Sequence, residues 1–459
     1  MQDILFEYEL NPTTWAYLSA LLTIGIYFKF NRLFSVRNLD LLGLIIFSPG
    51  LLLVFYGMVK KDPSLVQFGF AWLLAVGLLF VVRLFLDPLM VRRPMLDPNL
   101  SASGLTFTGI AILVFLTANV VSERPPNRLE FELASDASSG LQSPGCRFLY
   151  FLASFRNAPK SAEQEAQQQP DDNRKQQQRQ QRQQVPKRSQ PKADWTHPSD
   201  NAQMVVSRTI AILAQLATVI GIALIGYYHF GSLQTGTAAA VLYLLLPYVG
   251  QMGGRIDHVV PAALLVWAMA AYRRPLISGF ILGLAGGLIF YPLFLLPLGC
   301  SYYWQRGLRR FVLGALLGIL VMVVFVICVS GSPELARSQL QQMFGDTIFS
   351  REDLVGFWQA YHRAYRIPVL AVFVVLCGSL ALWPAQKNFG TLLSCSATVM
   401  LASQFCQGFE GGLYMAWYLP LLVLTTFRPN LEDRVALNAV IERRALWVGR
   451  LARRNRRPA

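Results

Sequence analysis

The feature that most constrains this 459-residue chain is a series of apolar runs, several of them long enough to cross a lipid bilayer. A helix of about 20 residues spans the roughly 30 Å hydrocarbon core of a bilayer. The runs must form helices, because backbone groups in lipid are satisfied only within their own segment or in a closed barrel, whose strands would alternate apolar and polar residues. The runs cover residues 15–30, 41–59, 68–86, 105–121, 205–227, 235–249, 259–272, 276–303, 311–329, 369–382, 392–405 and 413–427. We therefore predict an all-α, polytopic integral membrane protein with about 12 or 13 crossings.

Composition also indicates a membrane protein. Hydrophobic residues make up 54% of the chain and charged residues 15%, and the mean hydropathy is +0.39. Soluble domains carry charge at about a quarter of their positions. The net charge of +15 is typical of cytoplasmic loops rich in Lys and Arg, so we expect the lipid bilayer as a partner and no nucleic acid. The six cysteines lack metal-ligand spacing, and neither a metal nor another cofactor is expected.

Polarity divides the chain into four parts. Residues 1–121 form an N-terminal transmembrane block of about four spans, and residues 204–428 form a C-terminal block. Residues 122–203 between them are polar, and their Gln- and Arg-rich centre has too few apolar side chains to fold, so it is predicted to be disordered. Residues 429–459 form a basic tail with an apolar stripe. We expect this tail to lie on anionic lipid at the cytoplasmic face.

Two arginine clusters flank the apolar run 276–303. Arg273 and Arg274 precede it, and Arg306, Arg309 and Arg310 follow it. Loops rich in Lys and Arg favour the cytoplasmic side, so a single crossing would place one cluster on the unfavourable side. We therefore predict that the run folds back as a hairpin of two short half-helices. Both clusters are then cytoplasmic, and the turn approaches the outer face.

This topology places the residues around Asp257 on the extracytoplasmic side, together with the loop at residues 332–366. In the loop, Ser332 and Ser350 are helix-start signals, and aromatic residues from Phe357 onward follow helical spacing. We predict two helices that lie on the membrane surface. The spans contain almost no charge apart from Arg83, which argues against an ion-coupled transporter.

One stretch of the second block carries a longer pattern. Its elements are Asp257 at the start of a span, Arg273-Arg274, Gly279, Gly283-Leu284-Ala285, Tyr291-Pro292, Pro297 and the second arginine cluster. Over residues 253–310 this pattern resembles the GT-C membrane glycosyltransferases, and it is most similar to their polyprenyl-phosphate-sugar-dependent, mannosyltransferase-like branch. Two features differ from that family. Ile289 stands where members usually carry a lysine, and the loop after the first span, residues 31–40, offers only Asp40 as a carboxylate, on the side predicted to be cytoplasmic.

The resemblance implies a GT-C-like helical bundle that acts as a hexosyltransferase on the extracytoplasmic face. In such an enzyme a carboxylate takes the proton of the acceptor hydroxyl while the sugar leaves its phosphate carrier, and cations stabilise the departing phosphate. On this interpretation Asp257 is the catalytic residue. Arg255, His258 and Tyr291 bind the substrate.

We therefore expect a glycosyltransferase with a lipid-linked sugar donor, in a bacterial inner membrane and with its C-terminus in the cytoplasm. The alternative is a non-catalytic polytopic membrane protein, either a degenerate relative or a component of lipid or polysaccharide export or assembly. In that case Asp257 caps the span 259–272 and pairs locally with Arg255. Other carboxylates on the same predicted side are Asp346, Glu352 and Asp353.

Overall fold

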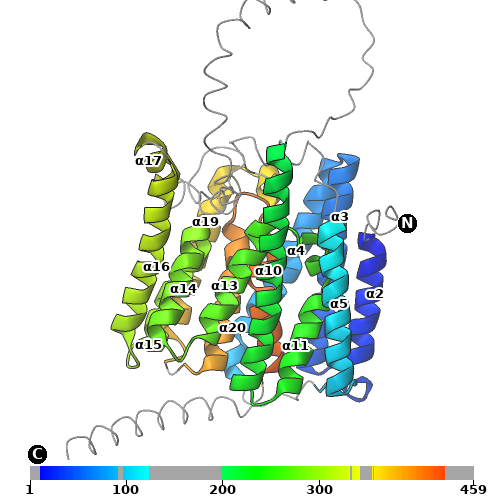
Figure 1. Cartoon of the computed structure of the whole chain (residues 1–459). Coiled ribbons are helices and arrows are strands. Elements are labelled where there is room, and N and C mark those ends of the chain that lie inside the picture. The colour runs from blue at the N-terminus through cyan, green and yellow to red at the C-terminus, as the bar shows by residue number, and fades with distance from the viewer. Residues whose placement is uncertain are drawn as a thin grey trace, which may run out of the picture.

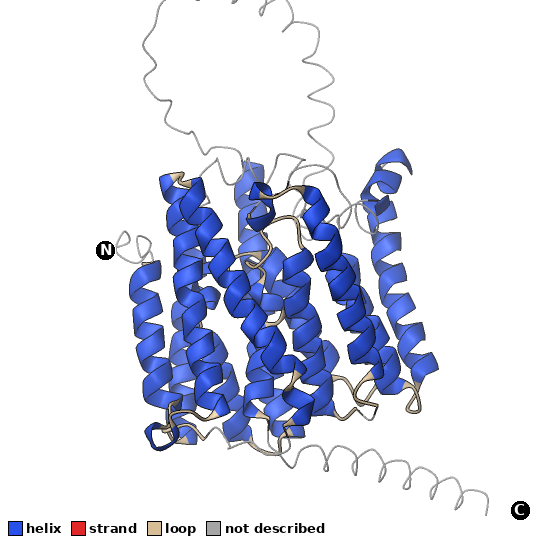
Figure 2. Cartoon of the chain, turned by 180° about the vertical axis from the view of Figure 1, so that it is seen from behind, coloured by secondary structure: helices blue, strands red, loops and turns tan. Residues whose placement is uncertain are grey.

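The computed structural model describes residues 11–90, 97–122, 198–330, 333–341, 354, 356–385 and 387–428. Within these ranges every regular element is a helix, which confirms the predicted all-α class (Figure 2). In this part of the chain six helices are long and apolar enough to cross a membrane, and four shorter ones are apolar as well. The chain is therefore a polytopic helical membrane protein. The number of crossings stays a prediction, because several elements are shorter than a bilayer is thick.

The helices stand side by side in one bundle, with α2 at one side and α16 at the other (Figure 1). In chain order the α-helices are α2 (Pro12–Tyr27), α3 (Val36–Lys60), α4 (Pro63–Phe85), α5 (Ala102–Ser122), α10 (Pro198–His229), α11 (Leu233–Leu245), α12 (Pro247–Met252), α13 (Ile256–Ala270), α14 (Pro275–Leu288), α15 (Leu296–Tyr303), α16 (Leu308–Val329), α17 (Pro333–Gln341), α19 (Arg366–Leu382), α20 (Phe389–Cys406) and α21 (Leu419–Phe427). Short 3-10 turns are η1 (Phe30–Arg32), η2 (Asp87–Leu89), η3 (Tyr291–Leu295), η5 (Phe357–Ala360), η6 (Arg363–Tyr365) and η7 (Met415–Trp417).

The start of α3 differs from the prediction. The Ser35 hydroxyl accepts a hydrogen bond of 3.3 Å from the backbone N–H of Asn38 and caps the helix. Helix α3 therefore begins at Val36, and it continues through Pro49. The sequence analysis places Asp40 in a loop, whereas the structure places it inside α3 with its side chain buried.

The hairpin predicted for the apolar run 276–303 is confirmed. Helix α14 leads away from the first arginine cluster, the chain turns at η3, and α15 returns to the same end of the bundle (Figure 1). At that end the Tyr303 hydroxyl donates a hydrogen bond of 2.7 Å to the backbone oxygen of Tyr272. The two arginine clusters therefore lie at one end of the bundle.

Helix α16 packs closely against α14, and the two helices run in the same direction. Each carries a pair of glycines four residues apart, Gly279 and Gly283 on α14 and Gly314 and Gly318 on α16. A Cβ added at Gly314 would collide with the backbone oxygen of Leu276. Small residues at this spacing allow two membrane helices to approach closely. The glycines of the motif on α14 thus serve helix packing.

Two of the predicted spans are not continuous helices. In residues 235–249 helix α11 stops at Leu245, because Pro247 has no backbone N–H with which to continue it, and the short helix α12 follows. In residues 413–427 only α21 is α-helical, and residues 407–418 are irregular apart from η7. Non-helical backbone at membrane depth is tolerated where protein covers it. Residues 411–428 are all buried, which meets that condition.

The loop at residues 332–366 contains one of its two predicted surface helices, α17. From Phe357 onward the expected helix is replaced by the turns η5 and η6. Gly356 precedes them with a φ of 85°, a left-handed conformation that interrupts helical backbone. The Trp358 indole is buried and donates a hydrogen bond of 2.9 Å to the backbone oxygen of Phe405. This aromatic side chain therefore contacts protein rather than the bilayer interface.

Several predicted features lie outside the described residues. They are the polar segment at residues 123–197 with its Gln- and Arg-rich centre, the basic tail at residues 429–459, and Ser332, Asp346, Ser350, Glu352 and Asp353.

The loops at one end of the bundle gather many cations, and we call this end the basic end. Contacts join its loops: Lys29 Nζ donates to Asn99 Oδ1 at 2.8 Å, and Arg306 donates to the backbone oxygen of Lys387 at 3.3 Å. Arg428, the last described residue, lies at the same end, because a Cβ added at Gly390, three residues after Lys387, would collide with its side chain. This grouping agrees with the topology inferred from the Lys and Arg bias. Which side of the membrane the basic end faces stays a prediction.

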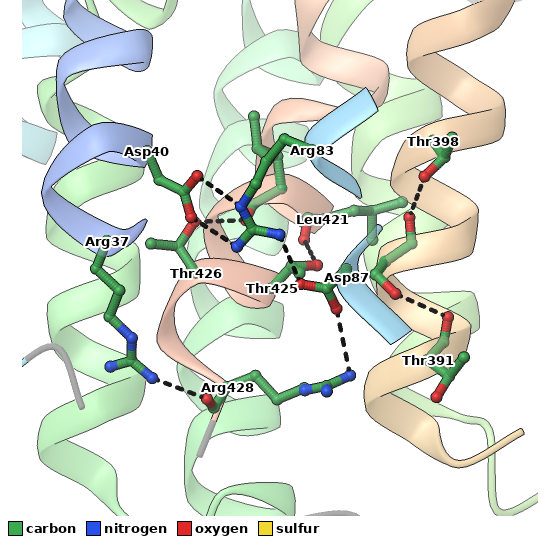
Figure 3. Close-up of polar contacts among 12 residues, drawn as sticks. Arg37, Asp40, Arg83, Asp87, Thr391, Thr398, Leu421, Thr425, Thr426 and Arg428 are labelled. Atoms are coloured by element: carbon green, nitrogen blue, oxygen red, sulfur yellow. Dashed lines mark hydrogen bonds and ion pairs between the residues drawn. The ribbon is translucent and has the colours of Figure 1, made fainter. Parts of the chain in front are cut away.

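A buried ion network ties α3, α4 and η2 together near the basic end (Figure 3). Arg83 donates to both oxygens of Asp40, at 2.9 and 2.8 Å, and to Asp87 at 2.8 Å. Asp87 lies 3.6 Å from the guanidinium of Arg428, and Arg37 donates to the Arg428 backbone oxygen at 3.1 Å. The charge that the sequence analysis singled out at Arg83 therefore has two carboxylate partners.

We expect Gly314→Ala to destabilise the protein, because its Cβ would force α14 and α16 apart. Overpacking of this kind costs about 1–3 kcal/mol, which thermal unfolding of the purified protein in detergent would show as a lower Tm. The matched control is Gly378→Ala on α19, where an added Cβ meets no atom within 4 Å. Equal Tm values for the two variants would contradict the close packing.

We expect Arg83→Met to destabilise the fold strongly, because it leaves the buried carboxylates of Asp40 and Asp87 without their shared cation. Breaking a buried pair in this way costs about 3–5 kcal/mol. Chemical denaturation in mixed micelles measures the loss. Arg309→Met, at an exposed position of the basic end, serves as the control and should change stability by less than about 0.5 kcal/mol. An Arg83→Met protein as stable as the control would show that the network does not hold the helices.

Candidate functional site

Arg255 and Asp257 lie where the chain turns from α12 into α13. Arg255 has extended backbone and immediately precedes the helix, and Asp257 is in its first turn, where the helix dipole favours a carboxylate. Arg255 donates to both carboxylate oxygens of Asp257, at 3.3 and 2.9 Å. The local pair that one interpretation of the sequence expects is therefore formed. Asp257 does not cap the helix, because the residue at the cap position is Arg255.

Arg255 has a second carboxylate neighbour that the sequence analysis missed. Glu410 Oε2 lies 3.7 Å from Arg255 Nη1, and the Glu410 side chain is only 15% exposed. Glu410 has a φ of 45°, in the left-handed region that glycine favours. The signal in the sequence is a single glutamate among Gly408, Gly411 and Gly412 inside an apolar stretch. Strained backbone of this kind is concentrated at functional sites.

His258 is fully buried beside this pair. The Tyr248 hydroxyl forms a hydrogen bond with His258 Nδ1, and His258 Nε2 lies 3.6 Å from the Asp257 carboxylate. The imidazole also stacks on the Tyr414 ring, with 4.5 Å between the centroids. His258 and Asp257, both named as site residues from the sequence, therefore lie beside two tyrosines, Tyr248 and Tyr414.

Tyr291 reaches the same region through an aromatic contact. It is the buried first residue of η3, and its ring centroid lies 5.8 Å from that of Trp417. The Trp417 indole donates a hydrogen bond of 3.2 Å to the backbone oxygen of Asp257. Tyr291 is therefore part of the same packed cluster, although it does not contact the carboxylates directly.

A second arginine near the cluster was also missed. Arg366, the first residue of α19, donates a hydrogen bond of 2.9 Å to the backbone oxygen of Cys406. A Cβ added at Gly408 would lie 2.7 Å from an Arg366 nitrogen, so this guanidinium packs on the start of the irregular segment. In the sequence Arg366 directly precedes an apolar run, and a charge there indicates only where a membrane span begins.

The contacts converge on residues 407–418, which we call the irregular segment. From this segment Glu410 faces Arg255, Tyr414 covers His258, and Trp417 bonds the backbone at Asp257. The Arg255 side chain is 42% exposed, more than either carboxylate beside it. Chemically, such a cluster can hold an anion through its arginine and accept a proton through a carboxylate. Among the described residues no three His, Cys, Asp or Glu side chains are grouped as metal ligands.

Comparison of the chain with protein-family models, with curated proteins and with solved structures finds no match.

We expect Arg255→Gln to lower stability and to do so through Glu410 as well as Asp257. The loss should be about 1–2 kcal/mol, below the value for a fully buried pair, because Arg255 keeps 42% of its side-chain surface exposed. A double-mutant cycle with Glu410→Gln, followed by chemical denaturation, should give a coupling of about 0.5 kcal/mol or more. Additive effects would show that Arg255 and Glu410 do not interact. Arg274→Gln, at an exposed position of the basic end, is the control and should be neutral.

Proposed function

We propose that this chain is a GT-C-like membrane glycosyltransferase that moves a sugar from a polyprenyl-phosphate carrier to an acceptor hydroxyl. The observation that carries the proposal is the convergence of Arg255 and Asp257, at the start of α13, with Glu410 of the irregular segment. Helix α13 begins at this cluster and ends at the basic end. The cluster therefore lies towards the end of the bundle predicted to be extracytoplasmic, where the donor sugar would be presented.

The reaction is a single displacement. The acceptor oxygen forms a bond to the anomeric carbon of the sugar, and the bond from that carbon to the carrier phosphate oxygen breaks. The phosphate leaves with the electron pair, and the hydroxyl proton passes to a carboxylate. In this proposal Asp257 is the base. Arg255 contacts the departing phosphate, because it is the most exposed charged group of the cluster.

The neighbouring residues have positioning roles. His258 is fully buried and is held by Tyr248, so its part is to support the carboxylate of Asp257 from the side. Arg366, which donates to the backbone oxygen of Cys406 at the start of the irregular segment, is a further cation that can share the charge of the carrier phosphate. Two cations and two carboxylates suit a step in which negative charge develops on one group while a proton moves to another.

The alternative, a non-catalytic membrane protein, is favoured by one specific observation. Both oxygens of Asp257 already accept hydrogen bonds from Arg255, so the carboxylate has a structural partner without any substrate. Ile289 is buried at the position where members of the GT-C family usually carry a lysine, and this difference also favours the non-catalytic alternative. The two functions differ in whether removal of the Asp257 charge affects turnover of a lipid-linked sugar.

We expect Asp257→Asn to reduce transfer by about 10²–10⁴, because the amide cannot accept the proton of the acceptor hydroxyl. Release of polyprenyl phosphate from a radiolabelled polyprenyl-phosphate hexose, in membranes that contain the protein, measures the loss. Expression and Tm are recorded for the same samples, so that misfolding is recognised.

The matched control is Asp62→Asn. Asp62 caps α4, and asparagine caps a helix equally well, so neither transfer nor folding should change. Glu410→Gln is assayed in parallel. Full transfer by Asp257→Asn would reject its role as the base, and transfer lost only in Glu410→Gln would assign that role to Glu410. Wild-type membranes that never turn over the donor would favour the non-catalytic alternative.

A further inference from the structure

Buried polar atoms without partners accumulate where α20 gives way to the irregular segment. Gln407 and Tyr414 are 0% exposed, and within the described part of the chain neither the Gln407 amide nor the Tyr414 hydroxyl has a hydrogen-bond partner. The side-chain amide nitrogen of Gln404 is also buried without a hydrogen-bond partner among the described residues. Native proteins leave only a few such groups per 100 residues, and each calls for an explanation such as a bound polar group.

The backbone around these side chains is held firmly. The backbone N–H of Gly412 donates to the side-chain oxygen of Gln404 at 3.3 Å, and Arg366 holds the backbone oxygen of Cys406 at 2.9 Å. A Cβ added at Gly411 would lie 2.7 Å from the backbone oxygen of Gln407, so the turn is tightly closed. These contacts position the segment, whereas the buried Gln407 amide and Tyr414 hydroxyl make no hydrogen bond within the described part of the chain. Such preorganisation is what a binding site requires.

We propose that Gln407 and Tyr414 form a subsite that recognises the hydroxyl groups of an uncharged sugar. An amide offers donors and an acceptor, and a phenol offers one of each, so both match a hydroxyl, which also donates and accepts. A phosphate or carboxylate only accepts and would leave the amide oxygen of Gln407 without a partner. Two carboxylates, Glu410 and Asp257, but only one arginine, Arg255, act on the Tyr414 hydroxyl, so an acidic sugar would meet net negative charge there. The subsite therefore fits a neutral hexose.

This inference rests on the proposed function, because it names the sugar end of the donor whose phosphate lies at Arg255. Its geometry is compatible with that assignment. Tyr414 stacks on His258, which lies 3.6 Å from Asp257, so the Tyr414 side chain belongs to the carboxylate cluster. The charged groups that act on the Tyr414 hydroxyl are Glu410, Asp257 and Arg255.

Binding and stability of Gln407→Leu test the subsite. The full-length protein in nanodiscs is titrated with polyprenyl-phosphate mannose and with polyprenyl phosphate alone. The variant should bind the sugar-bearing lipid about tenfold more weakly, the loss expected for a neutral hydrogen bond, and bind the sugar-free lipid as the wild type does. The Tm of the unliganded protein should stay the same or rise, because leucine removes a buried amide that lacks a partner. Tyr414→Phe should show the same pattern.

The control is Gln67→Leu on α4. The Gln67 amide donates a hydrogen bond of 2.9 Å to the backbone oxygen of Phe357, so its loss should lower the Tm and leave both lipid affinities unchanged. A lower Tm for Gln407→Leu, an equal loss of affinity for both lipids, or no preference of the wild type for the sugar-bearing lipid would each overturn the subsite. Failure of the proposed function looks different. The wild type would then discriminate between the two lipids, and the variants would lose that discrimination, but no sugar would be transferred.

Discussion

Backbone polar groups in lipid need hydrogen-bond partners, and in this bundle a stretch of non-helical backbone lies where protein covers it. Between Cys406 and Leu419 the chain leaves the α-helical conformation, and residues 411–418 are all buried. Contacts with neighbouring elements hold the segment in place: Arg366 donates to the backbone oxygen of Cys406 at its start, and Trp417, within it, donates to the backbone oxygen of Asp257. The bundle is thus organised around an irregular segment that a simple set of membrane-spanning helices would not contain. The polar side chains of that segment face protein, which is why a site can form there.

Two charge clusters in the bundle share a central arrangement but differ in how exposed their arginine is. In each, one arginine lies between two carboxylates: Arg83 between Asp40 and Asp87, and Arg255 between Asp257 and Glu410. Arg83 is 15% exposed and Arg255 is 42% exposed. A cation surrounded by its partners can only hold helices together, whereas an exposed one can still bind an anion. The cluster near the basic end is therefore a structural tie, and the cluster at Arg255 is the one suited to chemistry.

The sequence allowed prediction of those features that depend on local pattern and on the membrane. Apolar runs predicted helices, and the arginine pairs around residues 276–303 predicted the hairpin, because charge position and bilayer thickness together restrict topology. The sequence also brought Arg255, Asp257 and His258 to attention, since neighbours on one helical turn are close in any fold.

Contacts between distant segments could not be predicted in this way. Glu410 is 155 positions after Arg255, and only the fold of the irregular segment brings them together. Asp40 was assigned to a loop because the cap at Ser35 gives a weaker signal than the apolar run that follows it.

Departures from local structural rules occur at several places in the described bundle, for example at Lys61 and Gln251, and three of them are grouped in the irregular segment. Glu410 adopts a left-handed backbone conformation that costs a non-glycine residue of order 1–3 kcal/mol. Gln407 and Tyr414 bury polar atoms without partners, at about 1–3 kcal/mol each. If the irregular segment were only a connection between helices, apolar side chains and a glycine at position 410 would remove these costs without altering the path of the chain. A sequence keeps such costs where the residues serve something other than folding. Because Gln407, Glu410 and Tyr414 fall within eight residues beside Arg255 and Asp257, together they indicate a site at the irregular segment more strongly than any one of them does.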